Sequence, residues 1–384
     1  MVDLGEIVRG EGAQYLLTHD VWPVQRKAWR DIGQCQTEAL GSMPATCDDC
    51  EAEYRLLGSC GNRSCPLCAG EARKKWLEAR EEELLPVQYL HVVFAVPREF
   101  YVLAQYCPRA FYDAVMRATG QAVIDVGWSE LHIQLGCYTQ FHTWTQKLLK
   151  HLHAHVAVPA GGFSEGGSEW VPFEPGDLPA KALRKRFGTL LCRFVQDAAR
   201  KGKFDCLPST VKIEQLLVRA RAHRWKVYAK PPFGGGGGLL RYLARYMYRV
   251  AITNRRIESY ENRQVTFWCR TAAGTDEETL CTLEGQEFLR RFLMHVPPKR
   301  FVRSRSYGFL GNRKRKEMSA RAVQLIDEGK ERPSRAPFKP LRLCPECARR
   351  RGIRKTHFAP VLSPDVQSQI DIPLRPPPLG PIAA

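Results

Sequence analysis

The most informative absence in the 384-residue sequence is that of a long apolar run. No uncharged apolar segment approaches the roughly 18 residues that a membrane-spanning helix requires. The first residues, MVDLGEIVRGEG, also lack the basic-then-apolar order of a signal peptide. These absences argue against a membrane-spanning or secreted protein, so we expect a cytoplasmic protein with no membrane partner.

Acidic residues are fewer than basic ones: the chain has 40 aspartates and glutamates and 58 lysines and arginines. The formal charge of +18 and the isoelectric point near 9.4 favour a polyanionic partner, since cationic side chains release the counterions of nucleic acids. Nucleic acid is therefore the first partner that we expect. A basic protein without a nucleic-acid role is the alternative.

Strand and helix signals alternate irregularly along the chain, which predicts an α+β fold. We expect helices within 1–34 and at 73–85, 101–126 with a break at Pro108, 183–203 and 239–249, and strands at 88–96, 151–158 and 225–229. The segment 132–150 fits either a strand or a helix. Composition predicts four regions, 1–86, 87–295, 296–359 and 360–384, and the last is rich in proline and expected to be disordered.

Six of the fourteen cysteines lie between Cys35 and Cys68. In a cytoplasmic protein all fourteen cysteines are expected to be metal ligands or scattered buried thiols rather than disulfides. The two CxxC knuckles Cys47/Cys50 and Cys65/Cys68 have a spacing that can close a tetrahedral thiolate site around structural Zn²⁺, with Cys60 and Cys35 as further candidates. Reduced cysteines without a metal are the alternative. The pair Cys344 and Cys347 lacks an obvious partner knuckle.

Three histidines alternate along the predicted strand 151–158. Because side chains in a strand alternate with period two, His151, His153 and His155 share one face, and the other face is apolar. Neutral imidazoles two residues apart can bind one divalent ion, which could polarise a phosphodiester. An exposed polar strand face is the alternative.

Two tyrosines lie four residues apart in the predicted helix 239–249. Tyr242 and Tyr246 therefore occupy adjacent turns of one face, displaced from the apolar stripe of that helix. Arg245 and Arg249 on the same helix could hold a phosphate backbone. A packing or surface role for the tyrosines is the alternative.

The segment 299–316 contains eight basic residues and no acidic one, with three aromatic residues between them. Bases could stack on the aromatic rings, and phosphates could pair with the basic side chains. The expected DNA-binding residues here are Arg303, Arg305, Arg313, Lys314, Arg315 and Lys316. A solvated basic tail is the alternative.

Over about residues 20–345 the chain resembles the two-tyrosine HUH transposases of rolling-circle insertion sequences. The motifs that carry the resemblance are CDDC (47–50), SCGNRSCPLC (59–68), YLHVVFAVP (89–97), HTWTQ (142–146), HLHAHVAVPAGG (151–162), VYAKPPFGG (227–235), YLARYMYRVAITNRRI (242–257) and YGFLGNRKRKE (307–317). Two features depart from the family pattern. Ser64 stands where the family usually has histidine, and five glycines fill 234–238.

The resemblance implies a fold and a set of roles. It implies a small zinc-binding domain before a central antiparallel sheet with flanking helices, and a basic C-terminal DNA-binding region. It implies that His153 and His155 bind a catalytic Mg²⁺ or Mn²⁺ and that Tyr242 and Tyr246 are the paired nucleophiles. A third metal ligand normally completes such a site, and the candidates for it are His91, Gln146 and His151.

The activity implied is nicking and rejoining of single-stranded DNA, at transposon ends and target, through a 5′-phosphotyrosine intermediate. Another HUH enzyme, either a plasmid replication initiator or a relaxase, would share this chemistry. A non-enzymatic zinc-dependent DNA-binding protein is the alternative from another class.

Overall fold

The computed structural model describes residues 2–47, 50–70, 84–230, 250–271, 277–326 and 346–347. The predicted helix 239–249, the predicted tail 360–384 and nearly all of the predicted helix 73–85 lie outside these residues. The chain divides into two compact units, one from Met1–Cys35 and Ser59–Arg335 and the other from Gln36–Gly58 and Ala336–Ala384. The four regions drawn from composition stay a prediction.

The described elements alternate between helices and strands, as an α+β fold requires. The larger unit contains helices α1 (Leu4–Thr18), α2 (Pro23–Gln34), α4 (Tyr101–Tyr106), α5 (Pro108–Leu131), α6 (Ala180–Arg200), α7 (Ile213–Ala222), α9 (Gly285–Leu293) and α10 (Arg315–Ile326). Its strands are β3 (Tyr89–Ala95), β4 (Gly136–Trp144), β5 (Lys150–Pro159), β6 (Gly161–Phe163), β7 (Trp170–Pro172), β8 (Lys226–Lys230), β9 (Ile257–Glu261), β10 (Gln264–Arg270), β11 (Glu278–Glu284) and β12 (Ser304–Gly308). In the smaller unit β1 (Ser42–Thr46) and β2 (Glu53–Leu57) form a hairpin.

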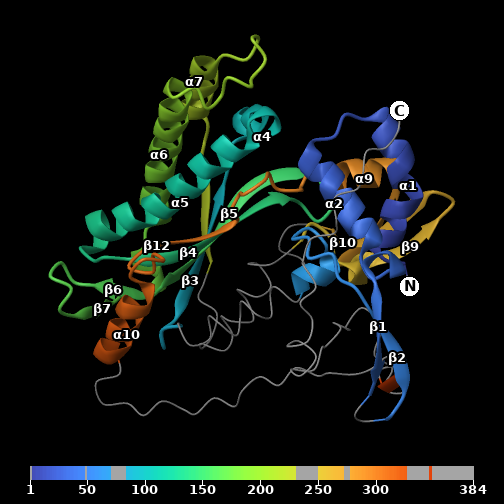
Figure 1. The fold of residues 1–384 in the computed structure, drawn as a ribbon. Helices are drawn as coiled ribbons and strands as arrows, with labels where there is room; N and C mark the ends of the chain where they lie inside the picture. The colour runs from blue at the N-terminus through green and yellow to red at the C-terminus, as the bar shows by residue number, and fades with distance from the viewer. Residues whose placement is uncertain are drawn as a thin grey trace. The chain divides into compact units, whose positions relative to one another are not determined.

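A five-stranded antiparallel sheet in the order β12-β4-β5-β3-β8 lies at the centre of the larger unit (Figure 1). The predicted strands 88–96, 151–158 and 225–229 correspond to β3, β5 and β8. The ambiguous segment 132–150 contains β4. The predicted α+β fold with a central antiparallel sheet is therefore confirmed.

One face of this sheet is buried beneath helices. Leu152, Ala154, Val156 and Val158 of β5 alternate along the strand, are at most 1% exposed and belong to the main apolar core. Helices α5 and α6 lie on this side of the sheet (Figure 1). The histidines of β5 therefore lie on the opposite face, as the period of two predicts.

The predicted break at Pro108 is present. Helix α4 ends at Tyr106, and α5 begins at Pro108, where the missing backbone N–H leaves no intrahelical hydrogen bond unmade. Among the described residues, no helix combines the length with the apolar character needed to cross a bilayer.

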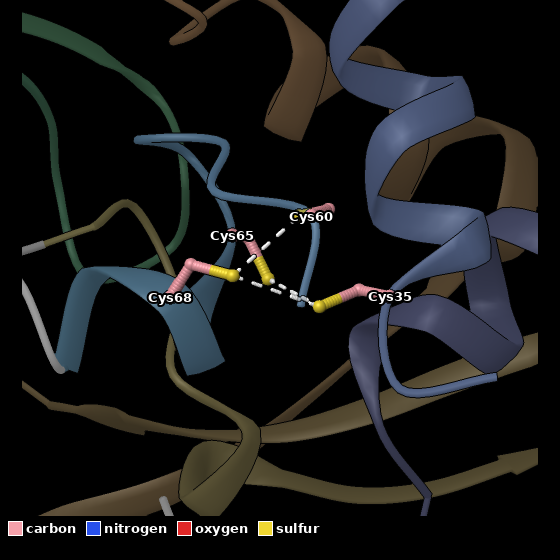
Figure 2. Close-up of side chains that lie close together, drawn as sticks. All are labelled: Cys35, Cys60, Cys65 and Cys68. Atoms are coloured by element: carbon pink, nitrogen blue, oxygen red, sulfur yellow. Dashed lines mark hydrogen bonds between the residues drawn. The ribbon is translucent and has the colours of Figure 1, made fainter. Parts of the chain in front are cut away.

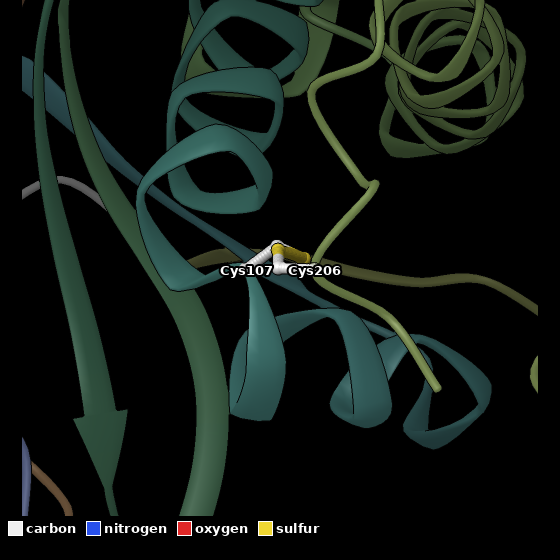
Figure 3. Close-up of a disulfide and its surroundings, with 2 residues drawn as sticks. All are labelled: Cys107 and Cys206. Atoms are coloured by element: carbon white, nitrogen blue, oxygen red, sulfur yellow. A yellow bond between two sulfur atoms is a disulfide. The ribbon is translucent and has the colours of Figure 1, made fainter. Parts of the chain in front are cut away.

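A disulfide joins Cys107, at the start of α5, to Cys206, in the segment between α6 and α7 (Figure 3). The expectation that cysteines outside the metal cluster are reduced thiols is wrong for this pair. The two residues are 99 positions apart, so their spacing in the sequence does not predict the bond. In the fold their Cα atoms lie 6.1 Å from each other.

The N-terminal helices pack against elements that lie far from them in the sequence. Helices α1, α2 and α9 share a core with the three-stranded sheet β11-β10-β9. Within this packing, the carboxylate of Glu11 is 1% exposed and accepts hydrogen bonds from Tyr260 (2.9 Å), Arg263 (2.8 Å) and Gln286 (2.7 Å). Burial alone would raise the pKa of Glu11, but the bonds from Arg263, Gln286 and Tyr260 hold that pKa below its usual value.

We expect Glu11→Ala to lower the free energy of unfolding by about 2 kcal/mol near neutral pH, because it leaves three donors without their charged acceptor. A carboxylate with a lowered folded-state pKa stabilises above its unfolded pKa, and the contribution disappears as pH falls through the folded value. The difference between variant and wild type should therefore shrink in acid. Urea unfolding measures it, with Glu6→Ala, exposed on the same helix, as the control. Equal losses in the two variants would contradict this account.

Candidate functional site

Three histidines from two neighbouring strands converge on the face of the sheet opposite α5 and α6. The ring nitrogens of His142 on β4 and of His153 and His155 on β5 all lie within 4.8 Å of one another. The strand register explains the convergence, because His142 lies directly opposite His153. Three imidazoles at this spacing can bind one divalent ion.

Hydrogen bonds orient two of these rings. The Nδ1 of His153 lies 3.0 Å from the carbonyl oxygen of His151, and a carbonyl can only accept, so this nitrogen carries the proton. The neutral ring of His153 then has its lone pair on Nε2. The Nδ1 of His155 contacts the Nε2 of His91 at 2.8 Å, and the same tautomer in His155 would direct its Nε2 lone pair away from His91.

The three residues expected to supply a third ligand do not belong to this group. His91 is 2% exposed, lies outside the group of three and contacts His155 from β3. Gln146 follows β4, and its backbone carbonyl accepts a hydrogen bond from Arg256. His151 is exposed, and its ring neighbours that of His153. His142 is therefore a further candidate for the third ligand.

His142 could have been found in the sequence only by assigning the segment 132–150 to a strand. In that case Gln140, His142 and Trp144 would alternate on one face. The imidazole of His142 is 3% exposed and stacks on Trp144, with ring centroids 4.7 Å apart. This contact holds the ring beside β5.

Two cationic side chains, Arg98 and Lys226, lie near the histidine face. Partial desolvation of the ring lowers the pKa of His151, and the nearby charges of Arg98 and Lys226 lower it further. Lys226 is exposed at the start of β8. An anionic ligand would therefore be attracted to this side of the sheet.

The expected nucleophiles Tyr242 and Tyr246, together with Arg245 and Arg249, lie outside the described residues. Their roles stay a prediction.

The basic segment 299–316 is folded into the sheet rather than forming a tail. It contains β12, which pairs with β4. Its aromatic residues are needed for packing, since Phe301 and Phe309 are 2% and 6% exposed and Tyr307 packs against the main core. The expectation that bases stack on these three rings is therefore wrong.

The six basic residues of that segment that were expected to bind DNA fall into two groups. Arg303 donates to the carbonyl of Arg63, Arg305 pairs with Asp113, and Arg315 donates to Asn312. The remaining three expected DNA-binding residues are exposed, and they are Arg313, Lys314 and Lys316.

A separate cluster of four thiols forms where α2 ends. Cys35, Cys60, Cys65 and Cys68 point toward one another (Figure 2), with all four sulfur atoms within 4.8 Å. The Sγ–Sγ distances include 3.7 Å from Cys35 to Cys68 and 3.6 Å from Cys60 to Cys68. Hydrogen bonds from Cys35, and then from Cys60 and Cys65, lower the pKa of Cys68. The pKa of Cys35 is also lowered, whereas hydrogen bonds with Cys35 raise the pKa values of Cys60 and Cys65, so two of the four thiols favour the thiolate form that binds metals.

The structure groups the cysteines differently from the sequence-based expectation. Cys47 and Cys50 lie in the smaller unit, close to Cys347, and do not share a cluster with Cys65 and Cys68. They lie in the turn of the β1–β2 hairpin, at the opposite end from the pair Ser42 and Leu57. The spacing of the cysteines along the chain could not reveal this division, because strand β2 lies between the two CxxC pairs in the sequence.

Comparison with known proteins gives the family. Residues 136–317 match a family model described as "Putative transposase", and residues 7–96 match one described as "Transposase zinc-binding domain". The "Putative transposase y4qJ" of Sinorhizobium fredii (strain NBRC 101917 / NGR234) is 35% identical over 368 residues, which cover 90% of this chain and 92% of that protein. The chain belongs to the two-tyrosine HUH transposase family. The transposase for insertion sequence element IS801 of Pseudomonas savastanoi pv. phaseolicola is 26% identical over 287 residues, or 73% of this chain and 68% of that protein.

The two matched segments of the transposase contain its two clusters. The three histidines lie within 136–317, and the four thiols of Figure 2 lie within 7–96. Four thiols within 4.8 Å of one another fit Zn²⁺, and a complete thiolate set leaves no position for a substrate. The transposase thus has a zinc-binding domain with a donor set suited to a structural zinc ion.

Proposed function

We propose that this transposase nicks and rejoins single-stranded DNA by tyrosine attack on a phosphodiester, for rolling-circle transposition of an insertion sequence. The observation that carries the proposal is the convergence of His142, His153 and His155 on the face of the sheet opposite its helices. Two of these histidines form the His-Ala-His motif of the family. DNA is the partner that a transposase requires, and single-stranded DNA at the transposon ends and target is the form that we propose.

The three histidines would hold Mg²⁺ or Mn²⁺, with remaining coordination positions directed toward the DNA. Bound there, the ion would offset negative charge that develops on the scissile phosphate. His91 would act as a positioning residue, since it contacts His155 Nδ1 and would thereby fix the ring of His155, whose Nε2 would be left to hold the ion.

Gln140 is a buried polar residue beside the histidines. It lies opposite His155 on the same face, and its Oε1 accepts a hydrogen bond from Ser304. Its Nε2 is buried and has no hydrogen-bond partner among the described residues. A buried donor without a partner is costly, and a phosphate oxygen or a water bound beside His155 would satisfy it.

Tyr242 and Tyr246 would supply the nucleophile. The phenolic oxygen attacks phosphorus, the new Oη–P bond replaces the P–O3′ bond, and the proton lost by the phenol is taken up at the 3′-oxygen. The products are a 5′-phosphotyrosine and a free 3′-hydroxyl. A 3′-hydroxyl can reverse the reaction on a new strand without ATP, because the covalent link conserves the energy of the phosphodiester.

Exposed residues beside the histidines would bind the strand. Tyr228 on β8 is 54% exposed and lies opposite Val93, which lies opposite His155. At about 4.8 Å per strand the ring is roughly 10 Å from His155, a distance that one or two nucleotides can bridge. We assign to Tyr228 a stacking contact with a base and to Lys226 a phosphate contact.

We expect Tyr228→Ala to weaken binding of single-stranded DNA by about 1–2 kcal/mol, or roughly 5-fold to 30-fold, because base stacking is lost. Tyr228→Phe keeps the ring and should bind as the wild type does, which separates stacking from the hydroxyl group. Fluorescence anisotropy with a labelled oligonucleotide measures both. Equal losses for the two variants would exclude the stacking role.

The proposed reaction is tested by incubating the transposase with oligonucleotides derived from the ends of its insertion sequence. We expect a free 3′-hydroxyl fragment and a protein-linked fragment, only from single strands and only with Mg²⁺ or Mn²⁺. Duplex DNA of the same sequence and a chelator are the controls. Binding without cleavage would favour a non-enzymatic DNA-binding protein, and cleavage confined to a plasmid origin would favour a replication initiator or relaxase.

A further inference from the structure

A pocket of about 640 Å³ lies among helices α5 and α6, which cover the face of the sheet opposite the three histidines. Its volume is within the range of about 300–1,000 Å³ that is usual for ligand pockets. We propose that this pocket binds unpaired nucleotides of the DNA outside the cleavage site, with a base against its aromatic rings and phosphates on its basic side chains. The inference rests on DNA as the partner of the transposase and not on the proposed cleavage chemistry.

The pocket presents more positive than negative charge. Its acidic residues are paired with arginines that do not line it. Asp113 pairs with Arg305, and Asp197 lies 3.8 Å from Arg200. Its basic residues are all exposed and, within the described part of the chain, none of them forms an ion pair with a carboxylate; they are Arg109, Arg117, Lys201 and Lys203. These four cations are therefore available to an anion.

Aromatic rings line the same pocket. The side chain of Trp22 is 48% exposed, and those of Tyr106 and Phe194 are half-buried. The guanidinium carbon of Arg117 lies 4.4 Å from the centroid of the Phe194 ring, so the cation is held over this ring. Exposed rings beside unpaired cations suit a nucleotide, because every base has a face that stacks and every nucleotide has a charged phosphate.

Contacts within the fold hold the walls of the pocket in place. The backbone N–H of Trp22 donates to Gln25 Oε1 at 2.8 Å, and the Gln25 side chain donates to the last carbonyl of α9 at 2.9 Å. The disulfide between Cys107 and Cys206 ties the segment with the two lysines to the start of α5 (Figure 3). Walls that are ordered before the ligand arrives lower the entropic cost of binding.

The distribution of the cations favours a strand over a free nucleotide. Arg109 and Arg117 are two turns of α5 apart, whereas the lysines lie at the end of α6 and just after it. Cations on two elements can contact successive phosphates of one strand, and single-stranded DNA is bound in this way along basic grooves.

Photo-crosslinking of the full-length wild-type transposase tests the proposal. We expect a single-stranded oligonucleotide with 5-iododeoxyuridine to crosslink to Trp22, Tyr106 or Phe194, which peptide mass spectrometry identifies. Unlabelled oligonucleotide should suppress this crosslink. Crosslinks with none in the pocket would overturn the proposal, and suppression by dATP as strong as by the oligonucleotide would assign the pocket to a free nucleotide instead of DNA.

A second measurement uses the yield of the pocket crosslink to titrate this site separately from any other. In the double variant Lys201→Ala and Lys203→Ala, the slope of log affinity against log salt concentration should fall by about 1 for each lysine. The control is the double variant Lys181→Ala and Lys185→Ala, which removes two exposed lysines of α6 outside the pocket and should keep the wild-type slope. Equal slopes in the two double variants would contradict a phosphate contact in the pocket.

Discussion

Replacing Tyr242 and Tyr246 together with phenylalanine is expected to abolish the covalent protein–DNA adduct, a loss of about 10⁴-fold or more in cleavage. The substitution removes one oxygen atom from each ring, so the bond to phosphorus cannot form while most packing contacts are kept. Each single variant should retain part of the activity, because either phenol can attack one strand. Denaturing gel electrophoresis of a labelled strand measures the adduct.

The chain contains a matched control for this pair. Tyr248 belongs to the same predicted helix but to the opposite flank of its apolar stripe, so Tyr248→Phe should cleave as the wild type does. Persistent adduct in the double variant would show that another residue is the nucleophile. Loss of adduct in Tyr248→Phe as well would indicate that any substitution in this helix stops cleavage. The loss in the double variant would then not identify Tyr242 and Tyr246 as the nucleophiles.

Replacing His142 with alanine should slow cleavage by roughly 10²-fold to 10⁴-fold, although the family motif names only the histidines of β5. His142 contributes one of the three imidazoles that lie within 4.8 Å of one another. With two donors left, the affinity for the ion falls, so a high Mn²⁺ concentration should restore part of the rate. A merely structural role for His142 would not produce this dependence on metal concentration.

The control for His142 is an exposed histidine away from the sheet. His19, which follows α1, is exposed and stacks on Tyr15. His19→Ala should cleave at the wild-type rate with the wild-type dependence on Mn²⁺. If His142→Ala behaved in the same way, the three-histidine site would be wrong.

Local periodicity predicted the two faces of β5 correctly. The alternation along 151–158 placed His153 and His155 on one face and the apolar residues on the other, because a strand has a fixed period of two. The break at Pro108 was also predictable, since proline cannot continue a helix. These features depend on neighbours in the sequence.

The remaining features depend on how strands, cysteines and aromatic side chains come together in the folded chain. His142 reaches His153 through the register of the β4–β5 hairpin, which could not be derived while the segment 132–150 fitted either a strand or a helix. The division of the cysteines depends on the hairpin that separates Cys47 from Cys65. The aromatic residues of the basic segment are interleaved with arginines, yet Phe301 is buried in the main core, where its ring packs against Tyr112 and Phe141.

The central claim is that a tyrosine of this transposase becomes covalently attached to single-stranded DNA. The most direct measurement is mass spectrometry of the protease-digested adduct, formed with Mn²⁺ on an end-derived oligonucleotide. The account predicts a 5′-phosphonucleotide on Tyr242 or Tyr246 and none on Tyr228 or Tyr248. An adduct on any other residue, or strand cleavage without a protein-linked product, would contradict it.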